Sequence, residues 1–322
     1  MSVWRDALPS LVLLAVVQIT DTTAQTMPVV GYVAAKNVDP KRLEVFKQGL
    51  MELGYVENRN IRIEYREAAL DAEYHSVVAE LTNLNVRMII AANVAATVAA
   101  AKATNTIPIV MLAVNDPVGV GVVKSLGRPG TNVTGTTAYA PQLIGERVQI
   151  LKRLVPNLDK LAMTLNSNNA NNIAQFELLR SEARQLGIEV QSLDIRKPKD
   201  VDAAFDKALI FGAKALVNAV DTFINSRRFA LAAGAAQHKL PVVYSDVEYV
   251  LAGGLMALGP GHHEGYYGAA KYVDKILRGA KPADLPIASP TQFTMSVNHS
   301  ALNKFGLSLP SDLSARVDEW ID

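Results

Sequence analysis

Short runs of β-branched and other apolar residues alternate with longer stretches of helical spacing along most of the chain. Residues 29–34 predict a strand, and Leu43, Phe46 and Leu50 then recur on one face of a predicted helix. Strands are expected at residues 29–34, 61–65, 88–92, 107–112 and 133–135, and again at 161–165, 190–194, 215–219, 242–244 and 254–258. Helices are expected at 40–53, 74–84, 95–103, 142–154, 173–186, 201–211, 226–238 and 266–277. This alternation predicts an α/β fold with two tandem units of parallel strands covered by helices.

The length and composition of the chain limit the classes of protein to which it can belong. The chain has 322 residues, which is enough for two domains of ordinary size, and it is 49% hydrophobic and 20% charged. The net charge is only +1 and no long run of one sign occurs, so a nucleic acid is not expected as a partner. There is no cysteine, which excludes disulfides, thiol catalysis, thiolate metal sites and a lipid-modified N-terminal cysteine.

The first 26 residues differ from the rest. A mostly apolar stretch at 7–17 is followed by polar residues, with Thr22 and Ala24 as the small residues of a cleavage site. About 11 apolar residues fall short of the ~20 that span a bilayer. We interpret 1–26 as a cleaved secretory signal peptide, which predicts an extracytoplasmic mature chain. An uncleaved anchor and an apolar N-terminal helix are the alternatives.

Polar residues follow most of the predicted strands. In open α/β sheets, ligands bind beyond the carboxyl ends of the strands, where helix N-termini present free N–H groups. The same positions hold Asn, Thr and Asp at 35–37, 93–95, 115–117, 136–138, 166–169, 221–222 and 246–248. Helix capping explains any one of these residues equally well, but their repetition in both units favours binding.

Motifs for catalysis or metal binding are weak or missing. His262, His263 and Glu264 are adjacent and lack the HExxH spacing, so no metal site is expected. The Gly259-Pro260-Gly261 turn lacks the third glycine of a dinucleotide fingerprint, and there is neither a phosphate-binding loop nor a GxSxG nucleophile motif. Acid–base catalysis by cleft carboxylates, Asp116, Asp221, Asp246 or Glu248, stays open at this stage.

Several segments together resemble the substrate-binding proteins of ABC transporters, in particular the group that includes binders of tryptophan and other aromatic amino acids. They are FKQGL at 46–50 with LGY at 53–55, IPIV at 107–110 with NDPVG at 115–119, and SLGRPGTNVTG at 125–135. In the C-terminal half, EY at 248–249, AGGLM at 252–256 and YVDKILRG at 272–279 are similar too. The resemblance covers about residues 28–320.

The resemblance implies a type I periplasmic-binding-protein fold, in which two Rossmann-like lobes are joined by three crossovers and close on a small ligand. It implies an N-terminal lobe of residues 27–137 and 251–283 and a C-terminal lobe of 138–250 and 284–322. It also implies transport without catalysis, no cofactor, and an ABC permease as the membrane partner of a monomeric periplasmic protein. The chain departs from the family at 93–96, at Val247 and at 261–268, so a changed ligand preference is plausible.

A cleft between the lobes is the predicted binding site. Backbone N–H groups near Asn93 and Asn168 are expected to bind a ligand carboxylate, and Asp221 or Asp246 a ligand amine. Tyr139 or Phe223 is expected to stack on an apolar or aromatic side chain. The residues expected to line the cleft are Lys36, Asn37, Asn93, Val94, Asn115, Asp116, Thr136, Thr137, Tyr139, Asn166, Asn168, Asn169, Asp221, Thr222, Phe223 and Asp246.

The sequence therefore predicts an extracytoplasmic solute-binding protein of an ABC importer, with an amino acid or a small aromatic or carboxylate compound as its ligand. Two alternatives remain. One is an exported ligand-sensing module that acts on a signalling partner. The other, less favoured, is an α/β lyase or isomerase that uses cleft carboxylates.

Overall fold

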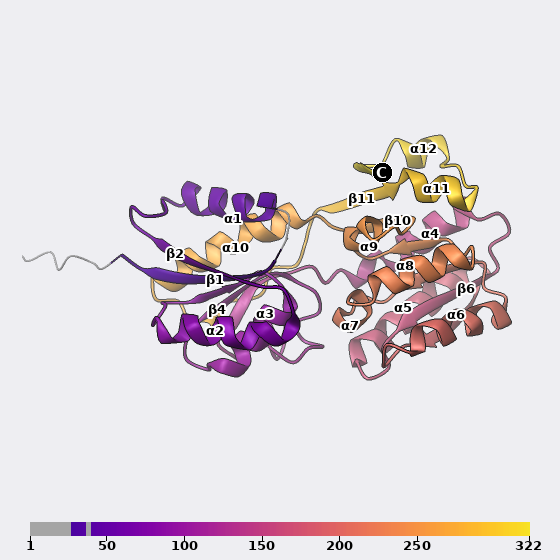
Figure 1. Cartoon of the computed structure of the whole chain (residues 1–322). Coiled ribbons are helices and arrows are strands. Elements are labelled where there is room, and N and C mark those ends of the chain that lie inside the picture. The colour runs from indigo at the N-terminus through magenta and orange to yellow at the C-terminus, as the bar shows by residue number, and fades with distance from the viewer. Residues whose placement is uncertain (1–26, 37–39) are drawn as a thin grey trace, which may run out of the picture.

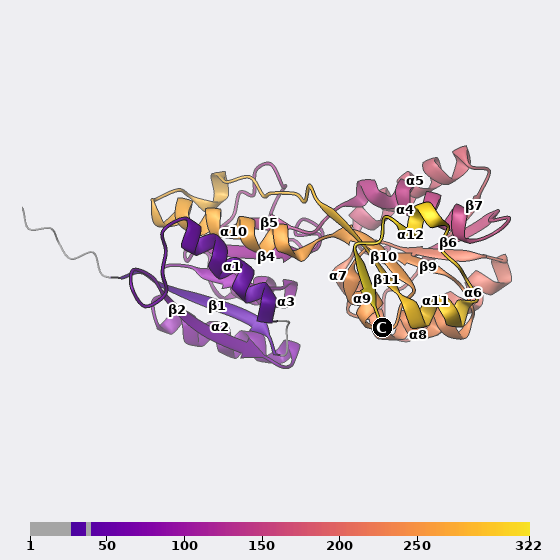
Figure 2. The same cartoon turned by 90° about the horizontal axis from the view of Figure 1, so that it is seen from above.

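The computed structural model describes residues 27–36 and 40–322 of the chain (Figure 1). The expected signal peptide and Asn37 lie outside these residues. Two lobes lie end to end and are joined by a narrow region, as both views show (Figures 1 and 2). Each lobe contains one sheet. The predicted α/β fold with two tandem units is thus confirmed.

The first sheet has five parallel strands in the order β2-β1-β3-β4-β5. They are β1 (Val29–Ala35), β2 (Arg62–Ala68), β3 (Ile89–Ala91), β4 (Ile109–Val114) and β5 (Val133–Thr137). The helices of this lobe are α1 (Pro40–Glu52), α2 (Tyr74–Asn83), α3 (Val94–Ala103) and, from much later in the chain, α10 (His262–Leu277).

Both faces of the first sheet are covered. Because side chains alternate along a strand, Val30 and Tyr32 of β1 pack with Phe46 and Leu50 of α1 and with α10, while Val33 packs with α2 and α3 on the other face. Figure 1 shows the two helix pairs on opposite faces of the sheet. The fully buried strands explain the near-continuous apolar runs in the sequence.

The second sheet has seven strands in the order β12-β11-β10-β9-β8-β6-β7. They are β6 (Lys160–Leu165), β7 (Glu189–Asp194), β8 (Ala215–Asn218), β9 (Val242–Tyr244), β10 (Met256–Pro260), β11 (Phe293–Asn298) and β12 (Glu319–Ile321). The associated helices are α4 (Ile144–Leu154), α5 (Ala170–Gln185), α6 (Asp200–Phe211), α7 (Thr222–Asn225), α8 (Arg228–Gln237), α9 (Val247–Leu251), α11 (His299–Phe305) and α12 (Ser311–Ser314).

The two sheets repeat one topology. Read from β7, the second sheet runs β7-β6-β8-β9-β10, which is the same doubly wound order as β2-β1-β3-β4-β5 in the first. The second sheet then adds β11, antiparallel to β10, and β12. No strand was predicted from the sequence after residue 258, where Pro282, Pro286 and Pro290 interrupt the chain, and this prediction was wrong. The alternation of apolar Phe293, Met295 and Val297 with polar residues is the signal of a strand.

The chain passes three times between the lobes. The first crossing, 138–140, follows β5, and the second is Gly261, because β10 pairs with β9 and β11 whereas α10 packs on α1, β4 and β5. The third lies between Ala288, which bridges Thr136 in the first sheet, and β11. The boundary expected between residues 250 and 251 is therefore about one strand too early. The boundary expected between 283 and 284 is also early, because Ile287 is part of the first lobe's core.

Close packing of α10 on β4 allows a matched test. A Cβ added to Gly265 would meet the Ala113 Cβ at 2.8 Å, whereas one added to Gly268 on the same helix meets only the Thr136 Cγ2, at 3.8 Å. We expect Gly265→Ala to destabilise the protein by about 1–3 kcal/mol through overpacking, and Gly268→Ala to stabilise it by about 0.5–1 kcal/mol through helix propensity. Urea unfolding midpoints measure both. Equal effects of the two substitutions would contradict this packing.

Candidate functional site

The order of the strands locates the site. In each sheet, the connections that leave two neighbouring strands run in opposite directions across the sheet. These strands are β1 and β3 in the first sheet and β6 and β8 in the second. A crevice therefore opens at their carboxyl ends. Lys36 and Asn93 follow β1 and β3, and Asn169 and Asp221 follow β6 and β8. Four of the predicted residues are thus placed at the two crevices by topology alone.

The side-chain amide of Asn169 bridges carboxylates of both lobes. The Nδ2 of Asn169, in the second lobe, donates to the Asp116 Oδ2 of the first lobe at 2.8 Å and to the Asp221 Oδ2 at 2.8 Å. Asp116 and Asp221 are only 1% and 5% exposed. Two buried carboxylates, one from each lobe, therefore share the hydrogens of one neutral nitrogen.

The remaining oxygens of both carboxylates are also occupied. Asp116 Oδ1 accepts from the Asn171 Nδ2 at 2.6 Å and from the backbone N–H of Gly119 at 2.9 Å. Asp221 Oδ1 accepts from the Ile224 N–H at 2.8 Å and so caps α7. Asn171 was not among the predicted residues, although the Asn-rich run at 166–172 carried the signal.

The backbone around Asp116 is adapted to this contact. Asp116 has φ +43°, a left-handed conformation that Asp tolerates better than most residues. A Cβ on Gly119 would lie 2.1 Å from the Asp116 Oδ2 and 2.8 Å from the Asn169 Nδ2. Glycine at 119 therefore permits the carboxylate and the amide to meet.

Three further predicted residues lie around this cluster. The Thr222 hydroxyl is 3.5 Å from the Asn115 carbonyl oxygen, across the lobes. Burial raises the pKa of Tyr139 to about 12, the Asp116 charge adds to this, and a hydrogen bond with Gln175 acts the other way. Tyr139 is therefore a neutral hydrogen-bonding group near Asp116 at physiological pH.

On the first lobe's side, Asn93 caps α3. Its Oδ1 accepts from the Ala96 N–H at 2.8 Å and its Nδ2 donates to the Tyr74 hydroxyl at 2.7 Å. Both roles hold Asn93 in place at the start of α3, where Val94 begins the helix. The N–H groups of that first turn point out of the helix end toward the crevice. Lys36 is exposed beside it.

Other predicted residues have local roles. Asn166 Oδ1 accepts from the Asn168 N–H at 3.1 Å, which shapes the loop before α5, and Asn168 itself is exposed. The Arg227 guanidinium lies 5.0 Å from the centre of the Phe223 ring, so this ring has a cationic neighbour within the second lobe.

The hydroxyls of Thr136 and Thr137 bond within the first lobe and to the start of the first crossing, where the Tyr139 N–H donates to the Thr137 Oγ1 at 3.0 Å. Thr136 Oγ1 accepts from the Ala113 N–H at 2.9 Å and donates to the Gly265 carbonyl oxygen at 3.0 Å, and Thr137 Oγ1 donates to the Val114 carbonyl oxygen at 2.6 Å. The reason is topological: β5 is the outermost strand of its sheet, two strands away from the crevice between β1 and β3. Their hydroxyls are used to attach β5 to its neighbours.

A second polar contact joins the lobes. Arg42 of α1 forms an ion pair with Glu248 of α9, and the Arg228 Nε lies 3.8 Å from the Glu248 Oε2. Asp246, predicted as a ligand residue, caps α9 by accepting from the Glu248 N–H at 2.9 Å. Sequence reasoning missed Arg42, because on a helix of alternating polarity it is indistinguishable from an ordinary surface residue.

The buried Arg147 is a further group that the sequence did not reveal. Its Nε donates to the Leu258 carbonyl oxygen at 2.9 Å, and its two terminal nitrogens have no hydrogen-bond partner in the part of the chain that the structure describes. Burial lowers the pKa of Arg147 to about 10, and the nearby Asp246 carboxylate opposes that shift. Arg147 therefore stays charged at neutral pH, and the negative charge of Asp246 stabilises it.

Residues 27–36 and 40–322 contain neither a metal-binding cluster nor a membrane-spanning helix. No group of three or more His, Cys, Asp or Glu side chains there is arranged to hold a metal ion. Within the same residues, every helix is too short or too polar to cross a lipid bilayer.

Comparison with known proteins agrees with this architecture. The family model described as "ABC transporter substrate binding protein" matches residues 29–321. A curated tyrosine-binding protein of Clostridioides difficile is 28% identical over 258 residues, which are 80% of this chain and 74% of that protein.

Solved structures give the same result for the fold. A conserved domain protein from Vibrio cholerae has a TM-score of 0.73 and 27% identity, covering 92% of this chain and 100% of that one. A domain from Streptococcus pneumoniae, solved in complex with L-Trp, has a TM-score of 0.74 and 22% identity, covering 91% and 99%. Structures of leucine- and arabinose-binding proteins share the fold at lower identity, which confirms the predicted type I periplasmic-binding-protein architecture.

The bridge through Asn169 leads to a prediction about the lobes without ligand. In Asp116→Asn, an NH2 group replaces one of the two carboxylate oxygens. In one orientation this NH2 faces the Asn169 Nδ2. In the other it faces the Asn171 Nδ2 and the Gly119 N–H, which are donors too, so a hydrogen bond is lost either way. We expect the equilibrium to shift about tenfold toward separated lobes, since hydrogen bonds to a charged group contribute about 1.5–3 kcal/mol. Small-angle X-ray scattering should record a larger radius of gyration.

The matched control is Asp206→Asn on the exposed face of α6, which removes the same charge far from the cleft. It should leave the radius of gyration unchanged. An unchanged radius in Asp116→Asn as well would show that this bridge does not hold the lobes together.

Proposed function

We propose that this chain, which belongs to the family of ABC transporter substrate-binding proteins, captures an amino acid in the cleft between its lobes. Members of that family bind solutes outside the cytoplasm for import. We infer that the bound amino acid is delivered to a membrane permease and is released there chemically unchanged. The extracytoplasmic compartment would be reached through the N-terminal segment, acting as a cleaved signal peptide into the periplasm.

The proposal rests on the two carboxylates, Asp116 and Asp221, that accept hydrogen bonds from the Asn169 amide. Asp116 Oδ2 and Asp221 Oδ2 each lie 2.8 Å from one nitrogen that donates to both. An ammonium group has three N–H donors and a full positive charge, so it satisfies the same two acceptors better than a neutral amide does. A ligand ammonium that displaced this amide would bind to both lobes at once.

A ligand with an ammonium must also fit the first lobe's crevice. The N-terminal turn of α3 carries unsatisfied backbone N–H groups and the positive end of the helix dipole, which suit a carboxylate. Asn93 fixes this turn through its capping bond to the Ala96 N–H. An α-amino acid carries both required charges on neighbouring atoms, which favours it over sugars or nucleosides.

The side chain of the ligand is proposed to be aromatic. The curated relative at 28% identity is a tyrosine-binding protein. Tyr139 beside Asp116 and Phe223 beside Thr222 supply ring surfaces near the carboxylates, and offset stacking contributes about 0.5–1.5 kcal/mol beyond the area buried. L-Tyrosine, L-tryptophan and L-phenylalanine are therefore the first compounds to test.

Thermal unfolding of the purified full-length chain, stripped of carried-over ligand by partial unfolding and dialysis, tests the proposal. At a hundredfold excess over Kd, a ligand stabilises the folded state by about 2.7 kcal/mol. We expect such a shift with an aromatic amino acid, recovered unaltered after overnight incubation. Absence of a shift with every amino acid, or chemical conversion of the one that binds, would refute solute capture.

A substitution then tests the carboxylates. Asp221→Asn keeps the cap on α7, because Asn is as good an N-cap as Asp, but removes the charge. We expect the Kd for the amino acid to rise at least tenfold, in line with loss of about 1.5–3 kcal/mol from a charge-assisted bond. The control Asp202→Asn, exposed on α6, should bind as the wild type does. Equal affinity in both variants would remove Asp221 from the site.

A further inference from the structure

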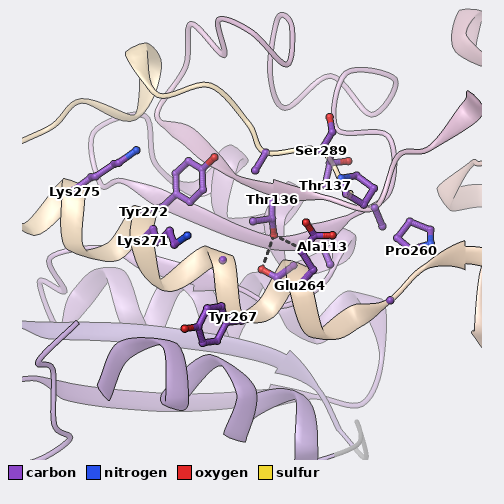
Figure 3. A pocket seen from close by; sticks show the side chains of 16 residues that line it. Ala113, Thr136, Thr137, Pro260, Glu264, Tyr267, Lys271, Tyr272, Lys275 and Ser289 are labelled. Carbon is purple, nitrogen blue, oxygen red and sulfur yellow. Dashed lines mark hydrogen bonds between the residues drawn. The ribbon is translucent and has the colours of Figure 1, made fainter. Parts of the chain in front are cut away.

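A second cavity lies at the hinge, apart from the cleft. It has a volume of about 250 Å³ and lies between α10, the ends of β4 and β5, and the segment at 288–290. Figure 3 shows Lys271, Lys275 and Tyr272 toward one end of this cavity and Pro260, Thr137 and Ser289 toward the other. Asp116, Asn169 and Asp221 do not line it.

The walls of this hinge cavity come from all three crossings between the lobes. Ala138 belongs to the first crossing, Gly261 is the second, and Ser289 and Pro290 belong to the third. A molecule bound here would contact every segment that must change its backbone angles when the lobes move. Binding of a molecule in the hinge cavity therefore depends on how the two lobes are oriented, and it in turn favours one orientation.

Glycines line one wall of the cavity. Gly265 and Gly268 lie on the side of α10 that faces β4 and β5, and Gly261 directly precedes the helix. A Cβ on Gly268 would meet only the Thr136 Cγ2, at 3.8 Å, so the space at this position is unfilled. Beneath them, the Thr136 hydroxyl ties the Ala113 N–H to the Gly265 carbonyl oxygen, as the dashed lines in Figure 3 mark. The floor is therefore fixed by hydrogen bonds, and side chains leave the space above it unfilled.

The charges at the cavity favour an anion. Lys271 and Lys275 are one helical turn apart and exposed, and neither forms an ion pair with any residue the structure describes. The one carboxylate in the wall, Glu264, is already bound by the Thr291 N–H at 2.8 Å and the Gln292 N–H at 2.9 Å. Two cations at one end thus have no protein counterion.

The rest of the lining is mostly apolar. Ala113, Ala138, Pro260 and Pro290 contribute carbon surface, and the hydroxyl of Tyr272 is used in donating to the Pro286 carbonyl oxygen at 2.6 Å. A volume just under the range of about 300–1,000 Å³ typical of small-molecule sites suits one ring or a short chain. The shape and charge therefore match a small molecule with an apolar body and one anionic end.

We propose that the hinge cavity is a second binding site, which takes a small organic carboxylate and holds the three crossings in their present arrangement. The carboxylate lies beside Lys271 and Lys275, and the apolar body extends from there past Gly268 toward Ala113. Binding here does not require the cleft to hold an amino acid, so this site is independent of the proposed function.

Benzoate is the probe, and benzamide, which has the same shape without the charge, is its neutral match. Isothermal titration of the full chain is expected to give a Kd of about 1 mM or tighter for benzoate and at least about tenfold weaker binding of benzamide. Lys271→Gln with Lys275→Gln should weaken benzoate about tenfold, whereas Lys304→Gln, an exposed helical lysine in the second lobe, should not.

Gly268→Leu provides a steric test that leaves both lysines in place, because the new side chain enters the cavity and its Cβ meets only the Thr136 Cγ2, at 3.8 Å. It should abolish benzoate binding. Hydrogen exchange should locate the ligand: benzoate is expected to slow exchange at 138–140, 261 and 288–291 in the wild type and not in Gly268→Leu.

Three outcomes would overturn the proposal. They are no benzoate binding to the wild type, equal binding to the wild type and the double lysine variant, and slowed exchange at the cleft loops 115–119 and 166–172 in place of the crossings. The double lysine variant changes only exposed side chains, so it remains informative if Gly268→Leu fails to fold.

Discussion

The two sheets are joined by a chain that crosses between them three times, and this constraint determines where a ligand can act. Three parallel connections allow the lobes to tilt while their carboxyl-terminal strand edges stay aligned. The crossings at 138–140, Gly261 and 288–292 are the only covalent links between the described parts of the lobes. The contacts between the lobes described above are non-covalent and polar, and they are therefore exchangeable for contacts with a ligand.

The polar contacts across the cleft differ in how far they are buried. Arg42 and Glu248 keep side-chain exposures of 20% and 25%, so water still reaches this ion pair and screens part of its attraction. Asp116 is 1% exposed, and a buried carboxylate without partners is strongly unfavourable. The Asn169 bridge is thus the contact that closure and ligand binding have to preserve or replace. A ligand cation is a better replacement than water, because it also compensates the charge of two neighbouring carboxylates.

The sequence predicted the sheets well and the site only in part. Buried parallel strands are continuous apolar runs, and so ten strands were found from local pattern, whereas β11 and the short β12 were missed near the C-terminus. Residues after β1, β3, β4, β6 and β8 were placed correctly relative to the strands, since chain order gives the end of each strand. The position of β5 at the edge of its sheet is a tertiary property, which is why Thr136 and Thr137 could not be separated from Asp116 in advance.

The repeated topology places two of the predicted carboxylates at equivalent positions of the two sheets. Asp116 follows β4 and Asp246 follows β9, which are equivalent strands of the two sheets, and both carboxylates meet cationic or amide donors at the lobe interface. Asp246 is approached by the buried Arg147, whose terminal nitrogens have no partner among the described residues. A charged guanidinium costs free energy in such a place unless a carboxylate faces it. Asp246 therefore stabilises the buried charge of Arg147, with a smaller contribution from Glu146. Removing the Asp246 carboxylate would leave that charge less well compensated, which restricts how position 246 can change.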